Sequence, residues 1–366
     1  MKQKLLPIDW LLLILTTTLT IIGLVFVLSS SFIWAGHRFN DSFYFFKRQL
    51  LFANLGFIGM IAVSKVNFRI YKKYATHFLF ASFALLILVL VPGIGLVRGG
   101  AQSWIGVGAF TIQPSEFMKL ALIVFLAKFM ADNPNEAKTF RHGVLPLIII
   151  ILVIFGIIML QPDFGTGMVI TATGILMLFL CGVPFKYFMY FVGVGLVGIT
   201  GLIISAPYRL ARITSYLDPL ADPTDSGFQI LQSLYAITPA GLLGQGFGGS
   251  IQKHFFLPEP HTDFIYAIVA EETGFIGAIF VLLLFICFFL RLAHIALKNK
   301  DLFARYLVLG IMSALCVQVM INVGVVIGLL PVTGITLPFM SYGGSSLTIT
   351  LISIGVVLNI SRNMET

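Results

Sequence analysis

This sequence contains very little charge. Only 10% of its 366 residues are Asp, Glu, Lys or Arg, whereas 58% are hydrophobic, and the mean hydropathy is +1.00. A water-soluble chain of this length needs many more charged residues to cover its surface. A bilayer accepts apolar surface but requires that backbone groups bond within helices. The composition therefore excludes a soluble globular domain and predicts an α-helical membrane protein.

Cysteine and histidine are also scarce. The three cysteines lie inside apolar runs, and the six histidines show no zinc-binding spacing. This pattern argues against a disulfide framework and against a structural zinc site. The formal net charge of +8 would suit a nucleic-acid partner, but the positions of Lys and Arg explain it better as a topology signal. We expect no nucleic acid.

Ten apolar stretches are long enough to cross the roughly 30 Å hydrocarbon core of a bilayer. The first follows a short basic start, is too long for a signal peptide and lacks a clear cleavage site, so we expect a signal anchor. The ten stretches lie at about 10–32, 47–64, 76–92, 115–131, 144–160, 167–183, 187–205, 264–290, 305–329 and 345–361.

The basic residues predict how these spans are oriented. With the N-terminus in the cytoplasm, most of the 23 Lys and Arg fall on the cytoplasmic side, as the positive-inside rule requires. Both termini are then cytoplasmic. No internal repeat is evident, so residues 1–366 are predicted to form one membrane domain, an all-α polytopic transmembrane bundle of about ten spans.

The longest outward connection, about residues 206–263, separates the seventh and eighth spans. A loop of this length in a compact bundle is usually functional or disordered. Its amphipathic middle, Phe228 to Ile237, favours a short helix on the membrane surface and therefore an ordered loop. Chemistry, if the protein has any, is expected on this extracytoplasmic face.

Few charged residues fall within the spans. Glu116 and Lys119 stand at i and i+3 in the fourth span, so they share a helix face and can form an ion pair. Such a pair is either structural or part of a polar lining, because isolated charge in lipid is costly. Glu271 and Glu272 lie in the eighth span, where at least one must face a partner or a water-filled cavity.

Asp263 immediately precedes the eighth apolar stretch. Thr262 or Asp263 is a natural N-cap for that helix, because a side-chain oxygen there satisfies free backbone N–H groups. The functional alternative makes Asp263 a general base at the outer membrane surface. A second outer acid, Asp163, has the same two possibilities at the start of the sixth helix.

The outer face also carries groups that suit a phosphate. Arginine side chains and the backbone N–H groups at a helix start both bind phosphate or pyrophosphate, although outward arginines and aromatic residues also commonly contact lipid headgroups. The candidates are Arg98, Arg209 and Arg212, Ser345 in the Gly-Gly-Ser-Ser turn that opens the tenth helix, and Trp104.

Six motifs lie in order between the third span and the end of the chain. They are RGGAQSWI at 98–105, QPSEFMK at 113–119, QPDFGT at 161–166, LPEPHTDF at 257–264, AEETG at 270–274 and LPFMSYGGSS at 337–346. In this order and spacing they resemble the shape, elongation, division and sporulation (SEDS) family, which includes RodA, FtsW and SpoVE. The string ITLP at 335–338 is more similar to the FtsW and SpoVE branch than to RodA.

The resemblance implies a peptidoglycan glycosyltransferase of the bacterial cytoplasmic membrane. Such an enzyme polymerises lipid II, a disaccharide-pentapeptide on undecaprenyl pyrophosphate, at the outer face of the membrane in cell division or spore cortex synthesis. The catalytic aspartate of the family matches Asp263, which favours catalysis over a cap alone. The residues expected to bind substrate are Glu116, Lys119, Arg98, Trp104, Asp163, Arg209, Arg212 and Ser345.

The departing pyrophosphate carries charge that must be offset. Lys119, the outer arginines or a bound divalent cation, Mg²⁺ or Mn²⁺, would do so, and the sequence identifies no metal ligands. The family also implies a class B penicillin-binding protein, a transpeptidase, as partner. Two other hypotheses stay open: a lipid II flippase and a scaffold that only recruits the transpeptidase.

Overall fold

The computed structural model describes residues 8–107, 110–204, 216–220 and 227–364. Its α-helices are α1 (Trp10–Phe39), α2 (Tyr44–Ser64), α3 (Arg69–Val89), α4 (Pro114–Asp132), α5 (Leu145–Met159), α6 (Phe164–Leu180), α7 (Phe185–Ile204), α9 (Phe228–Ile237), α10 (Ile265–Lys298), α11 (Leu302–Val326) and α12 (Gly344–Ser361). Short helical turns η1 (Glu136–Lys138), η2 (Phe140–Val144) and η3 (Thr238–Ala240) join some of them. Each of the ten predicted apolar stretches contains a helix, and the predicted helix at 228–237 is α9.

Seven helices in the described part of the chain are long and apolar enough to cross a membrane. Helix α6 is apolar but shorter. Helix α4 is not among the seven because Glu116, Lys119 and Lys128 give it more charge than such a helix normally carries. The α-helical membrane bundle is therefore confirmed, whereas the count of ten spans stays a prediction.

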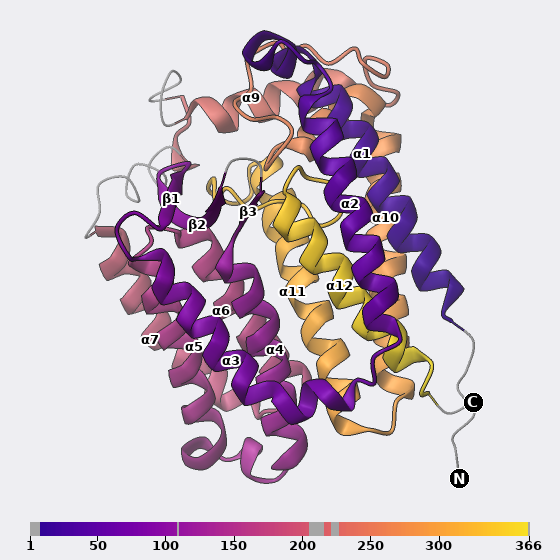
Figure 1. Ribbon diagram of the computed structural model, residues 1–366. Coiled ribbons are helices and arrows are strands. Elements are labelled where there is room, and N and C mark those ends of the chain that lie inside the picture. Colours follow the sequence, from indigo (N-terminus) through magenta and orange to yellow (C-terminus); the bar gives the residue numbers. More distant parts are fainter. Residues whose placement is uncertain (1–7, 108–109, 205–215, 221–226, 365–366) are drawn as a thin grey trace.

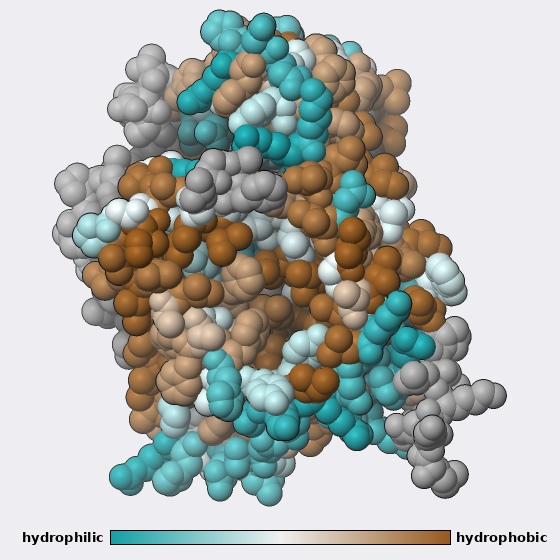
Figure 2. Space-filling model, in the orientation of Figure 1, coloured by the Kyte–Doolittle hydropathy of each residue, from teal (hydrophilic) through white to brown (hydrophobic). Residues whose placement is uncertain are grey.

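The surface of the molecule shows where the membrane lies. Figure 2 shows a broad hydrophobic band across the middle of the visible face of the bundle, with hydrophilic residues gathered at its two ends. Exposed apolar side chains at helix mid-points supply this band, and they include Ile58, Phe80 and Leu283. A lipid-facing band of this kind is what a multi-pass protein of the cytoplasmic membrane requires.

Helix α11 is the centre of the bundle. It packs against α4, α6, α9 and α10, and α11 and α12 are the most buried of the spanning helices. Helix α12 in turn packs along α2. Any polar side chain on α11 is therefore surrounded by protein, and it must find a partner there.

A small antiparallel sheet, which the sequence analysis missed, covers the outer end of α3 and α4. It consists of β1 (Gly95–Arg98), β2 (Ala101–Val107) and β3 (Phe110–Ile112) in the order β1-β2-β3. Gly99 and Gly100 connect the first two strands, and both have positive φ, 56° and 83°. This is the backbone of a type I′ hairpin turn, which favours glycine.

The described ends of the chain lie at one end of the bundle, and the sheet and α9 lie at the other (Figure 1). An ion pair of 2.7 Å between Asp9 and Arg291 ties the start of α1 to the far half of α10. Both ends thus lie on one side, as the charge distribution predicts. The connection that holds α9 and leads to Asp263 lies on the opposite, extracytoplasmic side.

Candidate active site

Asp263 lies directly before α10, at the extracytoplasmic end of the bundle. Its side chain is half-buried and accepts a hydrogen bond of 2.8 Å from the Thr262 hydroxyl. Its backbone carbonyl accepts a hydrogen bond of 2.7 Å from the side-chain amide of Asn322 in α11. The backbone that carries the Asp263 carboxylate is therefore held in place by a hydrogen bond from the neighbouring helix α11.

The structure corrects the cap predicted for this segment. Helix α10 begins at Ile265, so Phe264 occupies the cap position, and no side chain in the described residues caps this helix end. The Phe264 side chain is fully buried, and packing of this ring places the first helical turn after it. The prediction that Thr262 or Asp263 caps the helix is wrong, so the start of α10 does not depend on the Asp263 carboxylate.

His261, two residues before Asp263, packs among aromatic rings. Its ring centroid lies 4.2 Å from that of Phe45, and 5.6 Å from those of Trp34 and Tyr342. Burial lowers the pKa of His261 to about 3, so its imidazole is neutral at physiological pH. The residue supports the loop as a neutral ring rather than as a charged neighbour of the carboxylate.

A buried ion pair anchors the loop that leads to Asp263. The Lys253 ammonium lies 2.9 Å from a carboxylate oxygen of Glu272, and both side chains are almost fully buried. Ser29 of α1 donates to the same carboxylate at 2.7 Å. The sequence predicts an outward position for Lys253 but no partner, because the two residues belong to different elements and no periodicity joins them.

Glu271 binds another part of the same loop. Its carboxylate accepts hydrogen bonds from the Ser250 hydroxyl and from the Ile251 backbone N–H, the latter at 2.8 Å. The Gln245 backbone N–H donates to the Glu271 carbonyl at 2.9 Å. Both acids of the eighth span thus face protein, as the cost of charge in lipid predicts, and both hold the loop.

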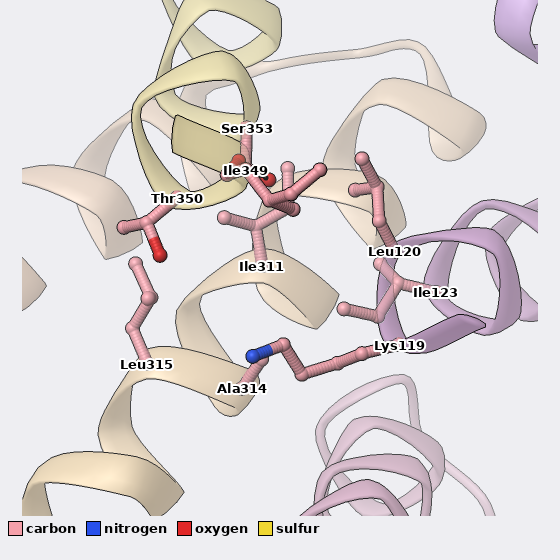
Figure 3. Close-up of a pocket in the computed structure, with 9 residues that line it drawn as sticks. All are labelled: Lys119, Leu120, Ile123, Ile311, Ala314, Leu315, Ile349, Thr350 and Ser353. Carbon is pink, nitrogen blue, oxygen red and sulfur yellow. Dashed lines mark hydrogen bonds between the residues drawn. The ribbon is translucent and has the colours of Figure 1, made fainter. Parts of the chain in front are cut away.

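The predicted pair of Glu116 and Lys119 forms near the outer end of α4. The Lys119 ammonium lies 2.7 Å from a Glu116 oxygen, with side-chain exposures of 9% and 8%, and it donates a second bond of 3.1 Å to Gln318 of α11. It also lines a small cavity of about 20 Å³ between α4, α11 and α12. Figure 3 shows the Lys119 side chain extending among the residues that line this cavity, with Thr350 and Ser353 contributed by α12.

Asp163 caps α6, which was one of its two predicted possibilities. Its carboxylate accepts the Thr166 backbone N–H at 3.1 Å and the Gln113 amide at 3.2 Å. The second bond joins two of the sequence motifs, because Gln113 immediately precedes α4. Asp163 thus fixes the outer starts of α4 and α6 relative to each other, and a contact with substrate stays a prediction.

Arg98 and Trp104 come together on the sheet. The Arg98 guanidinium lies 5.4 Å from the centroid of the Trp104 ring, across the β1–β2 pair. Nearby, the Arg48 guanidinium lies 4.2 Å from the centroid of the Tyr44 ring. Burial raises the pKa of Tyr342, and Arg48 opposes that shift. The sequence analysis did not identify Arg48 as part of this basic, aromatic surface.

The remaining candidates divide in two. Ser345 lies in the first turn of α12, is 5% exposed, and its hydroxyl has no hydrogen-bond partner among the described residues. A buried hydroxyl at a helix start suits an anionic ligand. Arg209 and Arg212 lie outside the described residues.

The described residues were also compared with the requirements of a metal ion. They contain no group of three His, Cys, Asp or Glu that could hold one. Mg²⁺ is commonly bound through one or two carboxylates together with phosphates of the substrate. The residues described by the structure therefore do not form a metal site built from protein ligands alone.

Sequence comparisons place the chain among known proteins. A family of cell cycle proteins that includes FtsW, RodA and SpoVE matches residues 9–366. Stage V sporulation protein E of Bacillus subtilis (strain 168) is 54% identical over 97% of both chains. The probable peptidoglycan glycosyltransferase FtsW of Geobacter sp. (strain M18) is 43% identical over 98% of this chain and 97% of its own.

Solved structures give the same result for the fold. A chain from a peptidoglycan synthase complex that coordinates polymerization and crosslinking matches with a TM-score of 0.81, at 31% identity over 98% of both chains. The rod shape determining protein RodA of Thermus thermophilus matches with a TM-score of 0.72, at 29% identity over 99% of both chains. The similarity therefore extends over the whole bundle and its outer loop.

Proposed function

This chain belongs to the family of cell cycle proteins that includes FtsW, RodA and SpoVE. From that membership we propose which reaction the protein catalyses and which residue is catalytic. It is a peptidoglycan glycosyltransferase of the bacterial cytoplasmic membrane. It polymerises lipid II into glycan strands on the extracytoplasmic side, in cell division or spore cortex synthesis. Asp263 is the catalytic residue.

The observation that carries this assignment is the position of Asp263. Its carboxylate is half-buried, at the extracytoplasmic end of a membrane bundle, and it does not serve as the cap of α10. The loop before it is held by Glu271, Glu272 and Lys253. A general base needs such a rigid support, because it acts only when it reaches the proton it removes.

The reaction joins two lipid-linked sugars. Asp263 accepts the proton of the acceptor's 4-hydroxyl while that oxygen attacks the anomeric carbon of the donor, and the bond to undecaprenyl pyrophosphate breaks. The leaving group takes up negative charge, which Lys119 offsets from α4. Glu116 and Gln318 hold that ammonium in place. Preorganised charge of this kind stabilises a transition state by several kcal/mol.

Other outer-face residues bind the two substrates in this proposal. Arg98, with Trp104 beneath it, and Ser345 at the start of α12 contact the anionic headgroups. Asp163 fixes the outer starts of α4 and α6 relative to each other, so that the residues on them are positioned for the headgroups. Arg209 and Arg212 belong to the same set by their sequence position. A divalent cation, Mg²⁺ or Mn²⁺, would enter with the pyrophosphate of the substrate and supply further positive charge.

The protein works with a class B penicillin-binding protein, the transpeptidase that crosslinks the strands. A similar chain is part of a peptidoglycan synthase complex that coordinates polymerization and crosslinking. The flippase alternative loses its main support, since Glu271 and Glu272 bind the loop rather than line a path across the membrane.

The test is polymerisation of labelled lipid II by the purified complex with its transpeptidase. Wild-type protein is expected to give polymer that a muramidase digests, and the initial rates of Asp263→Ala and Asp263→Asn are expected to be lower by about 100-fold or more. Size-exclusion profiles and melting temperatures of the variants show whether they fold. Equal polymer from folded wild type and variants would refute the role of Asp263.

A further inference from the structure

Asn322 lies in α11, one of the most buried helices of the bundle, and it is only 1% exposed. Its side-chain amide nitrogen donates two hydrogen bonds of 2.7 Å each, one to the carbonyl of Asp263 and one to the carbonyl of Ile335. Its side-chain oxygen has no partner among the described residues. Both hydrogen bonds of this side chain are therefore donated by its amide N–H groups.

The two carbonyls belong to different segments, which the Tyr342 N–H also joins nearby through a hydrogen bond of 2.8 Å to the His261 carbonyl. Asp263 ends the loop before α10, and Ile335 lies in the connection between α11 and α12 that leads to Ser345. Buried carbonyls need donors, because a buried acceptor without one loses the hydrogen bonds that water provides in the unfolded chain. One carboxamide thus satisfies two segments and fixes the distance between them.

The same face of α11 also carries Gln318, one helical turn away from Asn322. Residues at i and i+4 lie on the same side of a helix. Gln318 accepts a hydrogen bond of 3.1 Å from Lys119. A single rigid helix face therefore holds the ammonium assigned to the leaving group and the backbone of the residue assigned as base.

We propose that Asn322 is a positioning residue for Asp263, which sets the place of its carboxylate relative to Lys119 and to the start of α12. This inference rests on the proposed function of Asp263. Asn322 acts through the backbone carbonyl of Asp263, to which it donates. A displacement of about 1 Å at a reacting group can cost roughly 100-fold in rate, so the loss of this clamp is expected to lower kcat.

Asn322→Leu removes both donors and keeps a similar volume. We expect kcat for lipid II polymerisation by the complex to fall about 10- to 100-fold, with KM for lipid II changed less than threefold, because the headgroup contacts are elsewhere. Asn322→Ser, which retains one donor and is gentler on folding, is expected to lose less. Rates are normalised to folded complex measured by size-exclusion chromatography.

Asn359 supplies a matched control. It is also buried in a spanning helix, at 7% exposure, and it also clamps two backbone groups: it donates to the Ser64 carbonyl at 2.8 Å and accepts from the Phe68 N–H at 3.1 Å. It lies at the cytoplasmic end. Asn359→Leu is expected to lower thermal stability to a similar extent while kcat per folded complex changes less than threefold.

A double-mutant cycle separates positioning from general damage. If Asn322 acts through Asp263, the variant Asp263→Asn/Asn322→Leu is expected to be no slower than Asp263→Asn alone, because residues that act as a unit are not additive. Multiplying losses would overturn the inference, as would a folded Asn322→Leu with wild-type kcat. If Asp263→Asn itself polymerises at the wild-type rate, the proposed function fails first, and the two failures are thereby distinguished.

Discussion

At the scale of single residues, the buried pair of Glu116 and Lys119 combines stability with chemistry. Removing one partner of a buried ion pair leaves an uncompensated charge and typically costs about 3–5 kcal/mol. We expect Glu116→Gln to lower the melting temperature and to lower polymerisation, since Lys119 keeps only its bond to Gln318.

The double variant Glu116→Gln/Lys119→Met provides the control for this prediction. It removes both charges, so it is expected to regain most of the stability but not the activity. Thermal unfolding in detergent and lipid II polymerisation measure the two effects. Recovery of activity in the double variant would contradict the role of Lys119 at the leaving group.

The burial of His261 predicts that the stability of the folded protein depends on pH. Burial lowers its folded pKa to about 3, below the unfolded value of about 6.5. Below pH 6.5 the unfolded chain therefore binds more protons, and stability falls as the pH falls. Between pH 7 and pH 5 this residue alone is expected to cost about 2 kcal/mol.

His261→Phe suits the aromatic surroundings of this side chain and cannot titrate. The variant is expected to lose less stability than the wild type between pH 7 and pH 5, measured as the difference in thermal unfolding at the two pH values. Identical losses in the two proteins would show that the imidazole is protonated in the folded state or not buried.

The sequence could predict some of these residues and not others. Spacing along one helix identifies Glu116 with Lys119, and a motif identifies Asp263. Lys253 and Asn322 give no such signal. Their partners, Glu272 and Asp263, lie in other elements, and the partnership depends on how those elements pack.

At the scale of elements, the junction between the outer loop and α10 is the most constrained. Helix α10 is kinked at Gly274, where φ is 67°, and Gly244 approaches this kink. A Cβ atom on Gly244 would lie 2.4 Å from the Glu272 carbonyl oxygen, and its φ of 74° is strained for other residues. Only glycine allows the loop to lie this close to the acids that hold it.

Gly244→Ala tests this junction. We expect a loss of about 2–5 kcal/mol, the sum of a positive-φ cost of about 1–2 and an overpacking cost of about 1–3, together with reduced polymerisation. Gly248→Ala is the control, because φ there is 79° but nothing lies within 4 Å of its Cβ. Equal effects of the two changes on thermal unfolding would indicate that close packing contributes nothing.

Element type could be predicted where the apolar runs are long. The strands β1 to β3 were missed because they are short, lie in one connection between α3 and α4, and contain glycines that interrupt alternation. The cap of α10 was placed one or two residues too early, because burial of Phe264 outweighs the capping preference of Thr262 and Asp263.

At the scale of the whole molecule, composition alone predicts a membrane bundle, and the charge distribution predicts its orientation. Neither composition nor charge distribution predicts how the active site is assembled. It combines residues of α4, α11 and the loop before α10, which are distant in sequence and meet only at the extracytoplasmic end. A membrane enzyme for two lipid-linked substrates requires this arrangement, since both sugars are presented at that surface.

The most direct test is the initial rate of lipid II polymerisation by the complex for Asp263→Asn and Asp301→Asn. Both aspartates precede a spanning helix, but Asp301 caps α11 at the cytoplasmic end through the Phe303 and Ala304 N–H groups, and asparagine caps equally well. We predict a loss of 100-fold or more for Asp263→Asn, the usual contribution of a general base at about 10²–10⁴, and less than threefold for Asp301→Asn. Similar rates for the two folded variants would contradict catalysis by Asp263.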